Sequence, residues 1–183
     1  MSYRAAAAGD ARAVAALHAD SWRRFYRGAY ADAFLDGDVL TDRLAVWSRR
    51  LAASGADAVT IVAEVDGAIA GFVHVALDED ERWGSLLDNL HVGHAHQRLG
   101  IGSGLIVRAA RAVADRAATN AMYLWVLEQN DAAQAFYAAH GGRCAERADV
   151  DPPGGVPGRI NGRPAKLRYC WADVADMPGA VAT

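Results

Sequence analysis

The chain has 183 residues, of which 52% are apolar and 22% charged, enough to fold as one domain with a sizeable core. Its 19 basic and 22 acidic side chains give a net charge of −3 and form no basic run, which argues against nucleic-acid binding as the main task. No signal peptide is expected and no apolar stretch reaches the ~20 residues that cross a membrane, so we predict a cytoplasmic protein with no membrane partner.

The first third of the sequence reads as one strand followed by two helices. We predict a strand over residues 3–8 and a helix from residue 11 to about residue 28, with apolar residues three and four apart. Residues 30–37 are expected to be irregular. A second amphipathic helix is predicted from about residue 39, stopping at Gly55.

Three strands are predicted next. Residues 58–65 are rich in β-branched side chains, Asp66-Gly67 is a strong hairpin turn, and residues 68–77 run back. An acidic loop over residues 78–81 should lead to a third strand over residues 85–92. These strands form an antiparallel meander.

The second half alternates helices and strands. A helix begins near residue 100, with Ile101, Leu105, Ala109, Val113 and Ala117 in its apolar stripe. A strand covers residues 122–127. A second helix covers residues 132–140, with Asn130-Asp131 as its N-cap pair. Two final strands are predicted over residues 143–150 and 165–171. The order indicates an α+β fold, with helices flanking a mainly antiparallel sheet. We predict a single domain over residues 1–172 and a loose tail over residues 173–183.

A glycine-containing turn lies between the strand that ends at Val92 and the helix that follows. It carries Gln97, Arg98, Gly100 and Gly102. The first backbone N–H groups of a helix have no partner within the helix, and glycines let a phosphate approach them. The turn therefore predicts a diphosphate site, although glycine turns of this kind also occur without a ligand.

Two known diphosphate motifs do not fit this turn. A P-loop would need Lys-Ser/Thr after its last glycine, and the dinucleotide-binding fingerprint would need glycine where Leu105 stands. The pattern Gln97-x-x-Gly100-x-Gly102 instead resembles the pyrophosphate loop of the GCN5-related N-acetyltransferase (GNAT) family. A second motif supports the resemblance, since a strand, Asn130, Phe136-Tyr137 and Gly141 follow in the family's order.

The resemblance covers about residues 58–171 and implies a GNAT-like fold. Such a fold has a mixed, mainly antiparallel sheet of six to seven strands flanked by about four helices. It implies acetyl-CoA as co-substrate, with its pantetheine arm between two parallel strands that splay apart. The cofactor-binding residues implied are Leu90, Val92, Gln97, Arg98, Leu99, Gly100, Ile101, Gly102, Ser103 and Asn130.

The resemblance also implies two catalytic residues. Tyr137 matches the family's tyrosine that faces the coenzyme sulfur, where a phenol can protonate the leaving thiolate. Asp88 is our first choice for the base, because a base in this family often comes from the strand beside the acetyl group. Glu128 is the second choice and Glu64 the third, and Asp88 as a structural carboxylate stays equally open.

No metal site is predicted. His91, His94 and His96 are close in sequence, but no nearby cysteine completes a ligand set and two of them lie in the phosphate turn. Cys144 and Cys170 show no metal-binding spacing.

We therefore predict an acetyl-CoA-dependent N-acetyltransferase acting on a primary amine, most simply of a small molecule, by direct transfer in a ternary complex. The alternatives are a protein or peptide N-acetyltransferase and a non-catalytic acyl-CoA-binding regulatory domain. The resemblance places the acceptor site near residues 22–38 and 149–161. Its candidate walls are Trp22, Phe25, Tyr26 and Tyr30, and its candidate cation-attracting groups are Asp32, Asp36 and residues 78–81. A homodimer is a further prediction.

Overall fold

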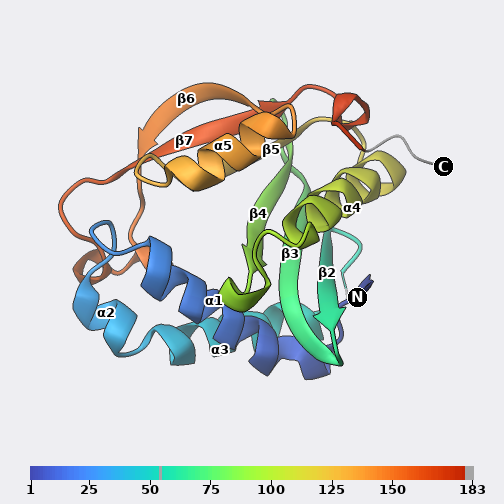
Figure 1. The fold of residues 1–183 in the computed structure, drawn as a ribbon. Coiled ribbons are helices and arrows are strands. Elements are labelled where there is room, and N and C mark those ends of the chain that lie inside the picture. Colours follow the sequence, from blue (N-terminus) through green and yellow to red (C-terminus); the bar gives the residue numbers. More distant parts are fainter. Residues whose placement is uncertain (54, 180–183) are drawn as a thin grey trace.

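The computed structural model describes residues 1–53 and 55–179, in which seven strands form one mixed sheet surrounded by helices (Figure 1). The sheet order is β1-β2-β3-β4-β5-β7-β6. The strands are β1 (Ser2–Ala5), β2 (Ala58–Val65), β3 (Ala68–Asp80), β4 (Gly84–Val92), β5 (Met122–Leu127), β6 (Arg143–Asp149) and β7 (Ala165–Trp171). The α-helices are α1 (Ala11–Phe25), α2 (Asp32–Asp36), α3 (Val39–Ala52), α4 (Ile101–Arg116) and α5 (Asp131–Ala139).

The sheet is antiparallel except between β4 and β5, which run parallel. These two strands pair only at Ser85–Met122 and Leu86–Tyr123, and beyond these pairs they separate. Figure 1 shows β5, β6 and β7 leaving β4 at a wide angle. The sheet therefore opens in its middle, on the side where β4 leads into α4.

A β-bulge in β4 accompanies this opening. Leu87 lies opposite Val75 and Asn89 lies opposite His74, so Asp88 is the extra residue on β4. A bulge bends its strand and increases the local twist, which turns β4 away from β5.

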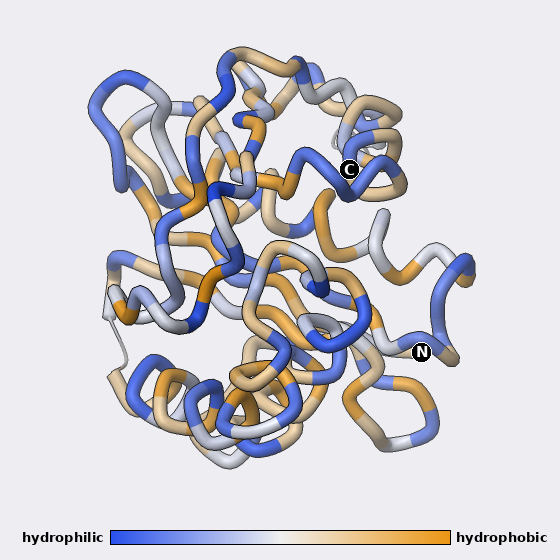
Figure 2. The backbone as a smooth tube through the Cα atoms, turned by 90° about the vertical axis from the view of Figure 1, so that its left-hand side faces the viewer, coloured by the Kyte–Doolittle hydropathy of each residue, from blue (hydrophilic) through white to orange (hydrophobic). Residues whose placement is uncertain are grey.

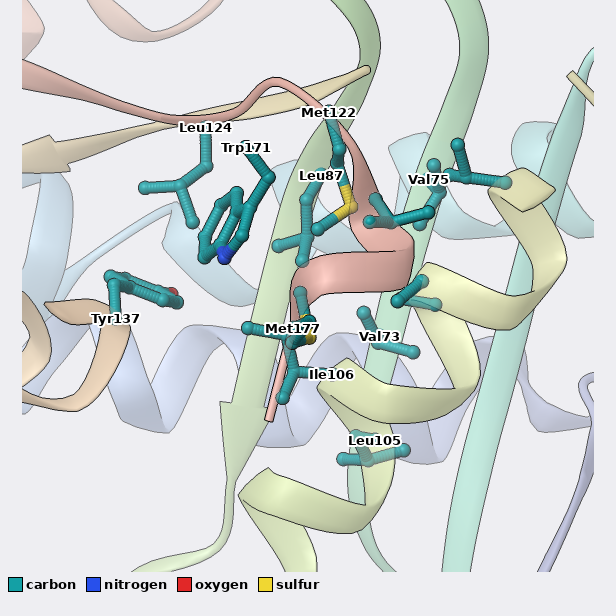
Figure 3. Packing of buried hydrophobic residues seen from close by; sticks show 14 of the residues in the cluster. Val73, Val75, Leu87, Leu105, Ile106, Met122, Leu124, Tyr137, Trp171 and Met177 are labelled. Carbon is teal, nitrogen blue, oxygen red and sulfur yellow. The ribbon is translucent and has the colours of Figure 1, made fainter. Parts of the chain in front are cut away.

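Apolar side chains cover both faces of the sheet. On one face α4 packs Leu105 and Ile106 against β3, β4 and β5, with Tyr137 of α5 at the edge of the same cluster (Figure 3). On the other face Trp47 of α3 and Val14 of α1 pack on Phe72. Figure 2 shows the mixture of apolar and polar residues along the helices, and the stripe expected for the helix after the glycine turn is buried as predicted.

Three local predictions are wrong at the edges of elements. The first strand ends at Ala5 and a 3₁₀ turn covers Ala8–Asp10. A short helix, α2, forms within residues 30–37, because Phe34 and Leu35 are buried against α1. The acidic segment is not all loop, since β3 runs to Asp80, which accepts the N–H groups of Arg82 and Trp83 in the hairpin turn.

Residues 173–179 differ from the loose tail that we predicted. They form a 3₁₀ turn (Val174–Asp176) in which Val174 is 1% exposed, and the following Met177 is 2% exposed. Figure 3 shows Met177 beside Ile106 and Leu87, inside the main core. The rest of the predicted tail, residues 180–183, lies outside the described residues. None of the helices described is long and apolar enough to cross a membrane.

Candidate active site

A cavity of about 430 Å³ occupies the place where β4 and β5 separate. Its walls come from α1, β4, the loop before α4, the first turn of α4, β5 and α5. Along residues 87–92 of β4, the backbone groups that face the gap have no strand partner among the described residues. Unpaired backbone N–H and C=O groups in a cavity are available to hydrogen-bond a ligand that has amide groups of its own.

The loop at one end of the cavity has the geometry of an anion site. Gly100 has a φ of +78° and Arg98 a φ of +62°. Both values lie in the left-handed region, which residues other than glycine rarely adopt. The first i→i−4 backbone hydrogen bond of α4 runs from Gly104 N to Gly100 O at 2.9 Å. The N–H groups of residues 101–103 therefore have no acceptor within the helix, and the helix dipole favours negative charge there.

Most of the predicted cofactor residues surround this cavity. Those that line it are Leu90, Val92, Gln97, Arg98, Gly100, Gly102, Ser103 and Asn130. Leu99 and Ile101 do not line it, because Leu99 is 61% exposed and Ile101 is buried in the core. The donor set of backbone N–H groups, Arg98 and Gln97 fits a diphosphate, so these residues suit a coenzyme A diphosphate by chemistry.

Asn130 has a structural task as well as a place in the cavity wall. Its Oδ1 accepts a hydrogen bond from Ala133 N at 3.1 Å, which caps α5 as its position before the helix indicates. The cap fixes the start of α5 and thereby places Phe136 and Tyr137. Phe136 lies close to Gly102, where a Cβ atom would be 3.4 Å from its ring.

Tyr137 lines the cavity and is only 8% exposed. Burial raises the pKa of its hydroxyl above the usual value, and the nearby Tyr26 hydroxyl raises it further. The phenol therefore keeps its proton throughout the neutral range. A protonated phenol in the cavity wall can donate a proton to a leaving group.

Asp88 also lines the cavity, from the bulge of β4. Its Oδ2 lies 2.6 Å from Arg50 Nη1 and accepts a hydrogen bond from Asn89 Nδ2 at 2.6 Å. Asp88 is the acidic side chain among the cavity-lining residues of the described chain. The two other base candidates do not line the cavity. Glu128 pairs with Arg147, and Glu64 pairs with Arg4.

The three neighbouring histidines have separate environments. His91 lines the cavity, its Nδ1 lies 2.8 Å from Ser21 Oγ, and burial lowers the pKa of its ring to about 4. His96 lines the cavity near the loop, whereas His94 does not. Among the residues that the structure describes, no three metal-ligating side chains are grouped.

The aromatic wall expected for an acceptor is partly present. Phe25 and Tyr26 line the cavity, but Trp22 and Tyr30 pack in the core beneath α1 and α2. Trp125 of β5 lines the cavity and was not predicted. Its strand reads as uniformly apolar, so the sequence gives no sign of which side chain faces the gap.

The acidic groups expected to attract a cation have other partners. Asp32 and Asp36 both pair with Arg27. Asp78 accepts the N–H of Ala118 at 2.9 Å, and Asp80 closes the β3–β4 turn. None of these carboxylates lines the cavity, and neither do Glu79 and Glu81 of the same acidic segment.

Comparisons with known proteins agree with this architecture. The PaiA N-acetyltransferase from Thermoplasma acidophilum, in complex with coenzyme A, superposes with a TM-score of 0.70 at 16% identity, covering 93% of this chain and 98% of that one. A GCN5-related N-acetyltransferase from Rhodopseudomonas palustris gives 0.71 at 17% identity, covering 93% and 94%. YncA from Salmonella typhimurium, with its cofactor acetyl-CoA, gives 0.66 at 19% identity, covering 94% and 93%.

These likenesses show the fold, and the family comes from the sequence itself. A search of curated protein sequences gave no significant match. The profile of the acetyltransferase (GNAT) family matches residues 14–141, which include the glycine loop, Asn130, Tyr137 and Gly141. Enzymes of this family transfer an acyl group from acetyl-CoA, their co-substrate. The chain therefore belongs to the GNAT family and is an acetyltransferase.

Proposed function

We propose that this acetyltransferase moves the acetyl group of acetyl-CoA onto a primary amine of a small molecule, by direct transfer in a ternary complex. The observation that carries the proposal is the cavity between β4 and β5. Its wall includes the glycine loop, Tyr137 and Asp88. A candidate anion-binding loop, a proton donor and a carboxylate therefore line the same cavity.

The cofactor is held by the loop and by β4. Arg98, Gln97 and the free N–H groups at the start of α4 bind the diphosphate, with the glycines leaving room for it. The unpaired backbone edge near Leu90 and Val92 binds the amides of the pantetheine arm. When bound, acetyl-CoA supplies a thioester carbonyl and a thiolate leaving group.

Tyr137 and Asp88 have different roles in proton transfer. Tyr137 donates its proton to the departing sulfur, and burial keeps that proton on the phenol until it is needed. Asp88 assists removal of a proton from the amine. This help matters because a lysine-like amine has a pKa near 10.4, so neutralising it at pH 7 costs about 4.6 kcal/mol.

The size and composition of the cavity support a small acceptor. A volume of about 430 Å³ must hold the pantetheine arm and the acceptor together. Besides Asp88, the lining residues outside the loop include Ser21, Phe25, Tyr26 and Trp125. Aromatic walls with one carboxylate suit an amine that has an apolar body.

The test is thiol release from acetyl-CoA with a panel of small primary amines and a panel of peptides that have free N-termini or lysines. We expect release above background with small amines, reduced by Tyr137→Phe. Release with peptides alone would make the acceptor a protein. Tight acetyl-CoA binding without release by either panel would instead indicate a regulatory domain, and would overturn the proposal.

A further inference from the structure

The ring of His140, just after α5, connects the C-terminus of that helix to the start of α4. Its Nδ1 lies 2.8 Å from the carbonyl oxygen of Phe136, and its Nε2 lies 3.0 Å from Ser103 Oγ. The His140 carbonyl accepts a hydrogen bond from Trp171 Nε1 at 2.8 Å, which fixes the backbone of this residue. Ser103 lines the cavity next to the glycine loop.

These contacts determine where the hydrogen atoms are. A carbonyl oxygen only accepts hydrogen bonds, so Nδ1 of His140 must carry a proton and donate it to Phe136 O. In the neutral ring Nε2 is then an acceptor, and the Ser103 hydroxyl donates its single proton to it. In this state Ser103 offers only lone pairs to the cavity. It therefore cannot donate a hydrogen bond to a phosphate oxygen, which is itself an acceptor.

Protonation of the ring reverses this polarity. With both ring nitrogens carrying protons, Nε2 donates to Ser103 Oγ, and the hydroxyl proton becomes free to point into the cavity. The C-terminus of α5 favours a positive ring, whereas the N-terminus of α4 opposes it. A negatively charged diphosphate on the loop would offset that opposition.

We propose that His140 is a positioning residue for the cofactor, and that binding of the diphosphate takes up a proton on this ring. The protonated ring turns the Ser103 hydroxyl toward the phosphate and adds a positive charge behind it. Cofactor affinity is therefore coupled to pH through a residue that does not itself line the cavity. This inference rests on the proposed position of the diphosphate at the glycine loop.

The titratable groups that line the cavity near this end include His96 and Arg98 of the loop and Tyr137 of α5. The uncharged Phe136 ring lies 4.3 Å from the His140 ring. In the described part of the chain, no carboxylate forms an ion pair with His140. Of the two histidines that line the cavity in the described chain, His91 is buried and its pKa is lowered to about 4, so His96 is the matched control.

The experiment is calorimetric titration with dephospho-CoA. This probe keeps the diphosphate but lacks the 3′-phosphate, whose own ionisation near pH 6 would confuse the result. From about pH 5.5 to about pH 8.5, we expect affinity to weaken about tenfold, the scale of one charge-assisted hydrogen bond. Titrations in buffers of different ionisation enthalpy should show proton uptake that peaks at about half a proton, the value that corresponds to a tenfold change in affinity. Pantetheine, which has no diphosphate, should show neither effect.

Two variants locate the effect. His140→Gln should bind dephospho-CoA with an affinity that no longer depends on pH, whereas His96→Gln should keep the pH dependence even if its absolute affinity changes. A merely structural His140 would give a uniform loss at every pH. Loss of pH dependence in His96→Gln but not in His140→Gln would overturn the proposal. Binding by the wild-type protein without proton uptake would overturn it even if the variant did not fold, and no binding at all would instead reject the diphosphate loop.

Discussion

At the scale of single residues, Tyr137 is the side chain whose chemistry is most sharply testable. Tyr137→Phe removes the hydroxyl and keeps the ring that packs in the core. If the hydroxyl stabilises the leaving thiolate, as we propose, kcat should fall by roughly 10- to 1000-fold with little change in cofactor affinity. Burial raises the pKa of Tyr137, so the wild-type phenol stays protonated over the neutral range and the deficit should be constant there. An unchanged kcat, measured where chemistry limits the rate, would end this assignment.

Asp88 has a different pH signature. Asp88→Asn keeps the shape of the side chain beside Arg50 and removes the carboxylate. If the carboxylate assists deprotonation, the rate should fall about 10- to 100-fold near neutral pH, and the deficit should shrink above the pKa of the acceptor amine, where free amine is abundant.

The control for Asp88 is Glu128→Gln, which removes a carboxylate outside the cavity lining. Full rate–pH profiles of both variants decide the matter. A pH-independent deficit in Asp88→Asn would make Asp88 structural, and a pH-dependent deficit in Glu128→Gln would move the base to that residue.

At the scale of elements, the glycine loop and the start of α4 can be tested together. Gly102→Asp places a negative charge where we propose that the diphosphate binds, and affinity for acetyl-CoA measured by calorimetry should then fall about 100-fold or more. Gly102→Ala is the control, because its Cβ lies 3.4 Å from Phe136 and adds no charge. Equal losses in the two variants would indicate packing against Phe136, and an unchanged affinity in Gly102→Asp would remove the loop from the cofactor site.

Elements with a strong local pattern could be predicted, and those shaped by distant contacts could not. The stripe of α4, the Asp66-Gly67 hairpin and the Asn130 cap depend on residues near in sequence, and each lies where the sequence places it. The bulge at Asp88 and the helix α2 depend on pairing with β3 and on packing against α1. The hydrophobic pattern within those segments does not indicate that they contact β3 or α1.

The same limit applies to the site. The loop residues could be identified because their spacing forms a motif, and eight of the ten predicted cofactor residues line the cavity. Trp125, Ser21 and the His140–Ser103 pair were missed, since only the folded chain brings these side chains to the cavity or to each other. The arginine partners of Asp32, Asp36 and Asp88 could not be predicted either. The sequence therefore does not show that the negative charges of these residues are already paired.

At the scale of the whole molecule, residues 173–179 complete the core. Met177→Ala removes a buried side chain packed beside Ile106, and we expect the free energy of unfolding to fall by about 2–5 kcal/mol in chemical denaturation. Leu40→Ala, at a position 42% exposed, should cost less than about 1 kcal/mol. Similar small losses in both variants would show that this segment is loosely attached, as its sequence had suggested.

Several properties of the whole protein stay predictions. These are the homodimer, the cytoplasmic location, the single domain over residues 1–172 and the independence from metal. The fold and the family do not depend on them.

The central claim is direct transfer between two substrates held in one cavity, and initial-rate kinetics tests it most directly. Thiol release is measured while acetyl-CoA is varied at several fixed concentrations of the best amine from the panel. A ternary complex predicts reciprocal plots that intersect, and a protein mass that shows no acetyl adduct when the enzyme is mixed with acetyl-CoA alone. Parallel plots, together with an acetylated protein that passes its acetyl group to the amine, would contradict the account.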